Sequence, residues 1–139
     1  MNYKSVLPKS GDRFLWVRFY ALGDALQGVA EAFLIKRRFP EIEMSFLTRP
    51  LYKDIIASQP YLDKVICGEK KPLSVLMNTA SAVKSAGTDW ICSTYQGAHM
   101  PLLAKMAGVR NRLGNSRYFG FMETQNIYSW CDSLGIDLF

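Results

Sequence analysis

Asp24 is the first residue of the chain whose type and position could do chemistry. It follows Gly23 in the turn Tyr20-Ala21-Leu22-Gly23-Asp24, after an apolar run at residues 14–19. A carboxylate held there could act as a general base on a substrate hydroxyl that reaches it. Asp24 and Gln27 also match the Asp-x-x-Gln pattern of a capping box, which would stabilise a helix start. The two roles are compatible, and the local sequence leaves both open.

Arg18 lies near the end of the same apolar run. A guanidinium in a buried strand is costly unless it reaches solvent or a partner. It extends to solvent, pairs with a carboxylate, or faces a ligand crevice, where its planar fork suits phosphate or carboxylate. The local sequence leaves these arrangements open.

A second candidate segment is Gln96-Gly97, which follows another apolar run at residues 89–94. A glutamine there could hydrogen-bond a sugar hydroxyl, and a glycine permits close approach of the backbone to a ligand. His99 is the only histidine, and no Cys/His spacing of a metal site is present. The first turn lacks both GxGxxG and the Walker lysine pattern, so we expect no metal and no cofactor.

These candidates need a scaffold, and the pattern of elements predicts one. Candidate strands at residues 14–19, 44–48, 64–67, 89–94 and 111–114, the first four of them mainly apolar, alternate with helical patterns. The first helical pattern carries Leu26, Val29, Ala30, Phe33 and Leu34 on one face. Such alternation indicates an α/β fold, a Rossmann-like open parallel sheet with helices on both faces. Ligands of these sheets bind beyond the carboxyl ends of the strands, where Arg18, Asp24 and Gln96 fall.

Composition sets the bounds of the function. A chain of 139 residues, 49% hydrophobic, is expected to form a single domain and excludes a disordered tail, a disulfide-stapled mini-protein and a large multi-domain enzyme. The three cysteines form no CxxC motif, which suits a reducing compartment. The sequence shows no secretory signal and no apolar run of the roughly 18 residues that would span a bilayer, so we expect a cytoplasmic protein. The net charge of +5 suits anionic partners. The basic residues Lys36–Arg38, Arg110, Arg112 and Arg117 match no nucleic-acid motif.

The opening segment resembles a known family. Residues Trp16-Val17-Arg18-Phe19-Tyr20-Ala21-Leu22-Gly23-Asp24 are similar to the first strand and turn of the ADP-heptose:lipopolysaccharide heptosyltransferases, glycosyltransferase family 9. Further similar segments follow in order: Arg38-Phe39-Pro40, residues 46–50, 63–66, 89–97 and 102–108, and Leu134-Gly135-Ile136. The resemblance covers about residues 13 to 137.

The resemblance implies an inverting, metal-independent enzyme of the two-domain GT-B type, with this chain as its N-terminal, acceptor-side half. Asp24 would be the catalytic base, and Arg18, Gly23, Gln96 and Gly97 would contact substrate. The donor, ADP-heptose, would bind mainly to a C-terminal domain absent from this chain, so the isolated domain should be inactive. The acceptor would be a lipid-anchored anionic sugar of the lipopolysaccharide core, reached by peripheral contact with the inner face of the cytoplasmic membrane.

Two positions depart from the family pattern. Thr94 stands where the family often has Asp, and Tyr20 where it often has Ser. Both lie on the acceptor side and bear on which acceptor is used. A free-standing flavodoxin-like binding or signalling module is the alternative function, although the sequence has neither a receiver-type acidic cluster nor a flavin phosphate loop. Nucleic-acid binding through the basic clusters is a third hypothesis, and it predicts an affinity that falls steeply with salt.

Overall fold

The computed structural model describes residues 6–19, 22–69, 72–94, 99–115 and 122–138. Six parallel strands form one sheet in the order β3-β2-β1-β4-β5-β6. The strands are β1 (Arg13–Val17), β2 (Glu43–Thr48), β3 (Lys64–Cys67), β4 (Trp90–Cys92), β5 (Asn111–Gly114) and β6 (Gln125–Asn126). The helices are α1 (Leu22–Arg38), α2 (Lys53–Ala57) with the short 3₁₀ turn η1 (Pro50–Tyr52), α3 (Leu73–Ser85), α4 (His99–Met106) and α5 (Ile127–Ser133). The predicted Rossmann-like α/β fold is confirmed.

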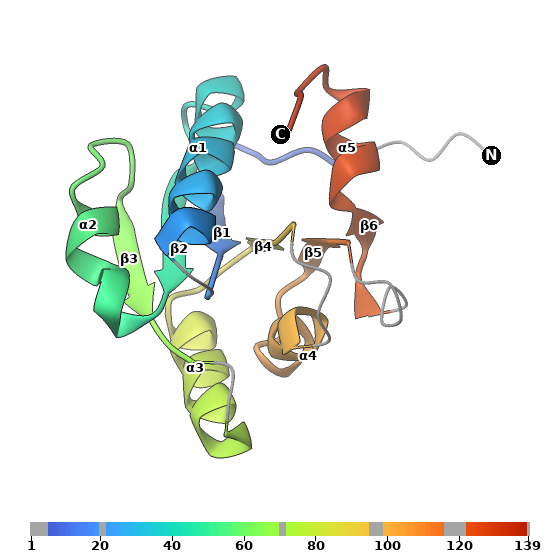
Figure 1. Ribbon diagram of the computed structural model, residues 1–139. Coiled ribbons are helices and arrows are strands. Elements are labelled where there is room, and N and C mark those ends of the chain that lie inside the picture. Colours follow the sequence, from blue (N-terminus) through green and yellow to red (C-terminus); the bar gives the residue numbers. More distant parts are fainter. Residues whose placement is uncertain (1–5, 20–21, 70–71, 95–98, 116–121, 139) are drawn as a thin grey trace.

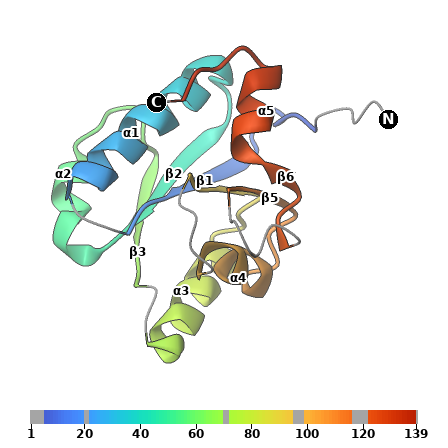
Figure 2. The same ribbon diagram turned by 45° about the vertical axis from the view of Figure 1, so that its right-hand side comes forward.

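Helices cover both faces of the sheet. Figure 1 shows α1 and α5 on one side and α3 and α4 on the other, and the turned view in Figure 2 agrees. Because side chains alternate along a strand, Phe14 and Trp16 of β1 pack into the core beneath α1 and α5. Leu15 and Val17 pack into a second core against α3 and α4. The central strand is therefore buried on both faces, as its continuous apolar sequence predicts.

The strand order reverses at β1, and this reversal fixes where a ligand can bind. The chain passes from β1 outward to β2 and β3, then returns across the sheet to β4 on the other side of β1. The register pairs Trp16 with Cys92, so β1 and β4 run side by side to their carboxyl ends. The helices that follow these strands depart to opposite faces of the sheet (Figure 1). The region beyond the carboxyl ends of β1 and β4 is the topological switch point of the fold.

Glycines follow three of the helices, and one short strand was not predicted from the sequence. Gly87, Gly108 and Gly135 follow α3, α4 and α5 with positive φ angles of 67°, 67° and 71°, the conformation that glycine adopts most readily after a helix. The two-residue β6 was not predicted, because Gln125 and Asn126 are polar and lack the apolar pattern of a strand. Its pairing of Leu113 with Gln125 depends on tertiary contact with β5.

The predicted apolar face of α1 is wrong in part. Leu26 and Phe33 are 43% and 44% exposed, whereas the buried face consists of Ala25, Gly28, Val29, Glu31, Ala32 and Ile35. The prediction followed the large hydrophobic residues, but α1 packs on the sheet mainly through small ones. Two large hydrophobic residues of α3, Leu73 and Met77, are likewise exposed.

Candidate active site

Arg18 occupies the centre of the switch point. Its backbone N–H donates to the carbonyl of Leu47 at 3.0 Å, which extends the β1–β2 pairing one residue beyond β1. Its side chain remains beneath α1, and the residue is only 8% exposed. A charged group held in this way requires partners within the protein.

Gly28 makes room for the Arg18 side chain. A Cβ atom at position 28 would lie 2.5 Å from Cγ of Arg18 and 3.0 Å from Cζ of Phe46. A glycine in the middle of a helix carries a conformational cost, and here the close approach of the arginine stem requires it. Gly28 lies on the same face of α1 as Asp24 and Glu31, since residues four and seven positions apart share one side of a helix.

The Arg18 guanidinium lies between two carboxylates of α1. Nη2 donates to Oε1 of Glu31 at 2.6 Å, and Nη1 lies 4.0 Å from Oδ1 of Asp24. The two acids differ sharply in their surroundings: the Glu31 side chain is 1% exposed, whereas that of Asp24 is 45% exposed. The cation thus has one buried partner and one that solvent, or a substrate, can reach.

Glu31 is incompletely satisfied for a buried acid. Its Oε1 is 3.5 Å from the Thr94 hydroxyl oxygen, which comes from the segment after β4. Its Oε2 and the Nε of Arg18 have no hydrogen-bond partner among the described residues. Burial raises the pKa of Glu31 above its ordinary value, and the hydrogen bond and positive charge of Arg18 oppose that rise.

Sequence reasoning missed Glu31. The available signal was an acidic residue between Ala30 and Ala32, within the most apolar part of a predicted helix. Its spacing of seven from Asp24 would have placed both on one helix face. Thr94 follows β4 and lies beside Glu31. The sequence had marked it only as a departure from the family pattern.

The structure corrects the predicted capping box. Helix α1 begins at Leu22, so Asp24 is the third residue of its first turn and not the residue before the helix. Its negative charge still interacts favourably with the amino end of the helix. For Arg18, the predicted pairing with a carboxylate is what the structure shows. Gly23 also lies in the first turn of α1, with open space where its side chain would be.

The structure does not bring the remaining predicted residues into this description of the site. Gln96, Gly97 and Tyr20 lie outside the described residues. His99 is the first residue of α4. Within the ranges that the structure describes, no group of three or more His, Cys, Asp or Glu side chains could hold a metal ion, and no helix is long and apolar enough to cross a bilayer.

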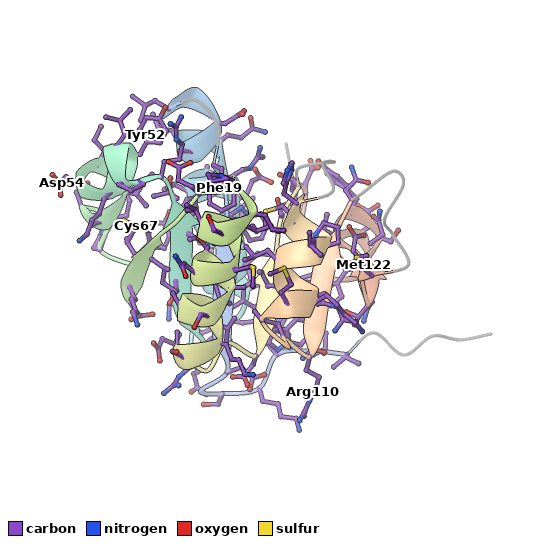
Figure 3. The ribbon with its side chains drawn as sticks, turned by 90° about the horizontal axis from the view of Figure 1, so that it is seen from below. Phe19, Tyr52, Asp54, Cys67, Arg110 and Met122 are labelled. Carbon is purple, nitrogen blue, oxygen red and sulfur yellow. The ribbon has the colours of Figure 1, made fainter. Side chains whose placement is uncertain are left out.

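The basic residues singled out in the sequence lie elsewhere. Arg112 donates to the carbonyls of Met122 and Val109, so its guanidinium ties the β5 segment to its neighbours. Arg110 points outward at the edge of the fold opposite to Phe19 (Figure 3). Lys36, Arg37 and Arg38 occupy the last turn of α1, where a positive charge is favourable. Arg117 lies outside the described residues.

The cysteines are structural in the described fold. Cys92 and Cys131 are buried and unpaired, and Cys67 is half-buried. Burial raises the pKa of Cys131 to about 12, and that of Cys92 is raised as well. Neither thiol is therefore a ready nucleophile at neutral pH.

Three solved structures that are similar to this chain are glycosyltransferases. A family 9 glycosyl transferase from Veillonella parvula superimposes with a TM-score of 0.82 at 15% identity, covering 96% of this chain and 44% of that one. Escherichia coli heptosyltransferase WaaC with ADP gives 0.72 at 13% identity, covering 91% and 48%. Escherichia coli ADP-heptose LPS heptosyltransferase II gives 0.63 at 13% identity, covering 74% and 30%. No protein-family model and no curated protein matches the sequence.

These likenesses define the class of fold. The chain has the Rossmann-like fold found in family 9 glycosyltransferases, and the resemblance expected from the sequence is confirmed at the level of structure. Identities this low show the fold alone. The chain spans less than half the length of each of these three neighbours.

Proposed function

We propose that this chain is the acceptor-side domain of an inverting glycosyltransferase that transfers heptose from ADP-heptose to a lipopolysaccharide core acceptor. The observation that carries the proposal is the half-exposed carboxylate of Asp24, placed at the switch point in the first turn of α1 and next to the Arg18 guanidinium. The fold shared with family 9 enzymes and heptosyltransferases supports the same assignment.

In the proposed reaction Asp24 is the general base. Its carboxylate accepts the proton of an acceptor hydroxyl while that oxygen forms a bond to the anomeric carbon of the donor sugar. The bond from this carbon to the diphosphate breaks at the same time, and the nucleoside diphosphate leaves with the electron pair. Attack opposite the leaving group inverts the anomeric centre through an oxocarbenium-like transition state, as in glycoside hydrolysis by inverting enzymes. Alignment of the two sugars must supply much of the rate.

The other substrate contacts belong to the same proposal. Arg18 keeps Nη1 on the side of Asp24, where it would attract an anionic group of the acceptor or the leaving diphosphate. Gly23 leaves open space beside Asp24, and Gln96 and Gly97 would contact acceptor hydroxyls. A second domain would bind the donor, so the 139-residue chain alone should not catalyse transfer. The enzyme would act without metal or cofactor at the inner face of the cytoplasmic membrane.

The replacement Asp24→Asn tests the base assignment. It removes the proton acceptor while keeping the size of the side chain, so we expect transfer in the natural full-length protein to fall at least a hundredfold, within the range of general-base contributions. The measurement is the initial rate of sugar transfer from ADP-heptose to lipopolysaccharide core acceptors, together with a thermal melt.

Asp54→Asn is the matched control, because Asp54 is also an acid in the first turn of a helix but lies in α2. It should leave the transfer rate unchanged. Near-normal turnover by the Asp24→Asn protein would show that Asp24 is not the base. A wild-type protein that binds neither nucleotide sugar nor core acceptor would instead support a binding module without catalysis.

A further inference from the structure

The buried half of the Arg18 cluster has no role in the proposed reaction. Glu31 is 1% exposed and too deep in the fold to meet a substrate, yet it makes the shortest contact of the cluster, 2.6 Å from Nη2 of Arg18. On the other side of the same guanidinium lies the reactive carboxylate of Asp24. Glu31 is thus connected to Asp24 through a single cation.

Several positions are adapted to this connection. One face of α1 carries Asp24, Gly28 and Glu31. Because Gly28 has no side chain, the Arg18 stem can pass between the two acids. Thr94 approaches Glu31 from the end of β4, so residues from β4, α1 and the end of β1 converge on one buried carboxylate. The arrangement fixes the guanidinium at one end while leaving its other end facing Asp24.

Stability alone does not explain a carboxylate at position 31. Removing two charges from water carries a penalty that their attraction repays only with complete hydrogen bonding, and well-packed apolar residues are often as good or better. Here Oε2 of Glu31 and Nε of Arg18 have no partner among the described residues. An apolar pair of side chains in the same space beneath α1 would stabilise the fold at least as well. The buried ion pair therefore points to a role in the site.

We propose that Glu31 is a positioning residue that acts on Asp24 through Arg18. This inference rests on the proposed function of Asp24. By holding Nη2, Glu31 keeps Nη1 at a distance from Asp24 and offsets the positive charge that faces it. A guanidinium without this buried partner would draw the Asp24 carboxylate into a tight ion pair and occupy the oxygen that must accept the proton.

The titration of Glu31 gives a direct readout of the coupling. Among the described residues, the charged and titratable groups around Glu31 are Arg18, Asp24 on its own helix, Cys92 of β4, and Tyr128 and Cys131 of α5, with the Thr94 hydroxyl beside them. Among these, the negative charge of Asp24 raises the pKa of Glu31. Coupling between two titrating groups is reciprocal, so a change at Asp24 must appear at Glu31.

The first experiment needs no enzymatic activity. The side-chain carboxyl carbons of glutamate are labelled with ¹³C in the full-length protein and titrated by NMR, and the Glu31 signal is assigned by its absence in Glu31→Gln. We expect the pKa of Glu31 to be lower in Asp24→Asn than in the wild type, and unchanged in Asp54→Asn. An unchanged Glu31 titration in Asp24→Asn would overturn the proposal, because the two acids would then be uncoupled.

The second experiment measures transfer. In Glu31→Gln we expect kcat to fall roughly tenfold to a hundredfold, the range for misplaced catalytic groups, with little change in KM for the acceptor and an altered acid limb of the pH–rate profile. If Glu31 had only a structural role, Glu31→Gln would lower the fraction of folded protein and leave kcat per folded molecule unchanged. An unchanged kcat per folded molecule would therefore contradict the proposal.

A double variant covers the case in which Glu31→Gln does not fold. Arg18→Met with Glu31→Leu replaces the buried pair by apolar side chains and should fold. Its kcat per folded molecule should equal that of Arg18→Met alone, because without the guanidinium Glu31 has no route to Asp24. A clear difference in kcat between these two variants would refute the positioning role. If the wild type itself transfers no sugar, the proposed function fails, and the NMR titration still decides whether Glu31 and Asp24 are coupled.

Discussion

At the scale of single residues, the chemistry of the site depends on how one arginine is accommodated. Arg18 follows a strand buried on both faces, and its guanidinium cannot lose its charge at any ordinary pH. The protein supplies Glu31 as a buried counter-charge and leaves Asp24 half-exposed. Two carboxylates beside one cation therefore have different surroundings and can take different roles.

The raised pKa of Glu31 predicts a pH dependence of stability. Because this pKa lies above the ordinary value of 4.5, the folded state binds more protons than the unfolded state between the two values. The contribution of Glu31 is fully present below pH 4.5 and is lost as the pH rises through its pKa in the folded state. In urea unfolding, the wild type should therefore gain stability relative to Glu31→Gln when the pH falls from 7 to 4.5.

The other acids titrate in both the wild type and Glu31→Gln, so their contribution cancels in the difference between the two free energies of unfolding. Glu41→Gln is the control, since it makes the same change at an exposed glutamate between α1 and β2. A stability difference between wild type and Glu31→Gln that stays constant with pH, or shifts in the opposite direction, would show that burial does not govern the titration of Glu31.

At the scale of elements, α1 combines packing with the construction of the site. Its small residues Ala25, Gly28 and Ala32 are buried and let the helix approach the sheet closely. The same face presents Asp24 and Glu31 to Arg18. A helix packed through large side chains would stand further from β1 and leave the guanidinium without these partners.

Gly28→Ala should destabilise the protein, although alanine favours helices. The new Cβ would lie 2.5 Å from Arg18 Cγ and 3.0 Å from Phe46 Cζ, so the helix or the arginine must move. We expect a loss of about 1–3 kcal/mol in the free energy of unfolding, the usual cost of overpacking. Urea denaturation followed by circular dichroism provides the measurement.

Gly23→Ala in the same helix is the matched control. Nothing lies within 4 Å of a Cβ at this position, so the substitution should stabilise by about 0.5–1 kcal/mol through helix propensity alone. Equal effects at the two glycines would show that the close approach at Gly28 imposes no constraint.

At the scale of the whole molecule, aromatic packing joins the two ends of the chain. Trp130 of α5 lies with its ring centroid 5.7 Å from that of Trp90 and 6.3 Å from that of Phe14. Its indole N–H donates to the carbonyl of Val6 at 3.0 Å. The last described helix is thereby attached to the central strands and to the segment before β1, on the face of the sheet that also carries α1.

Trp130→Ala should weaken the entire fold. Truncating a fully buried tryptophan in this cluster should cost about 3–5 kcal/mol in the free energy of unfolding, measured by urea denaturation. Trp130→Phe keeps an aromatic ring and loses the hydrogen bond to Val6, so it should cost clearly less. A small effect of the alanine variant would mean that α5 docks independently of this cluster.

The sequence by itself determined the class of fold and the position of the candidate site in it. Alternation of apolar runs with helical patterns requires parallel strands and crossover helices, and parallel strands place the residues after them at one edge. Arg18 and Asp24 could therefore be selected from residue type and position. Glycines after the helices were equally readable, because a left-handed residue there favours glycine.

Only the tertiary structure decided which side chains meet. The partnership of Arg18 with Glu31 depends on how α1 lies across β1, and the small residues that set this packing carry a weaker hydrophobic signal than the exposed Leu26 and Phe33. The position of Asp24 inside the first turn, the approach of Thr94 and the pairing of β6 likewise arise from contacts between segments distant in the chain. Local patterns specify elements, whereas the charge balance of a buried site is a property of the packed molecule.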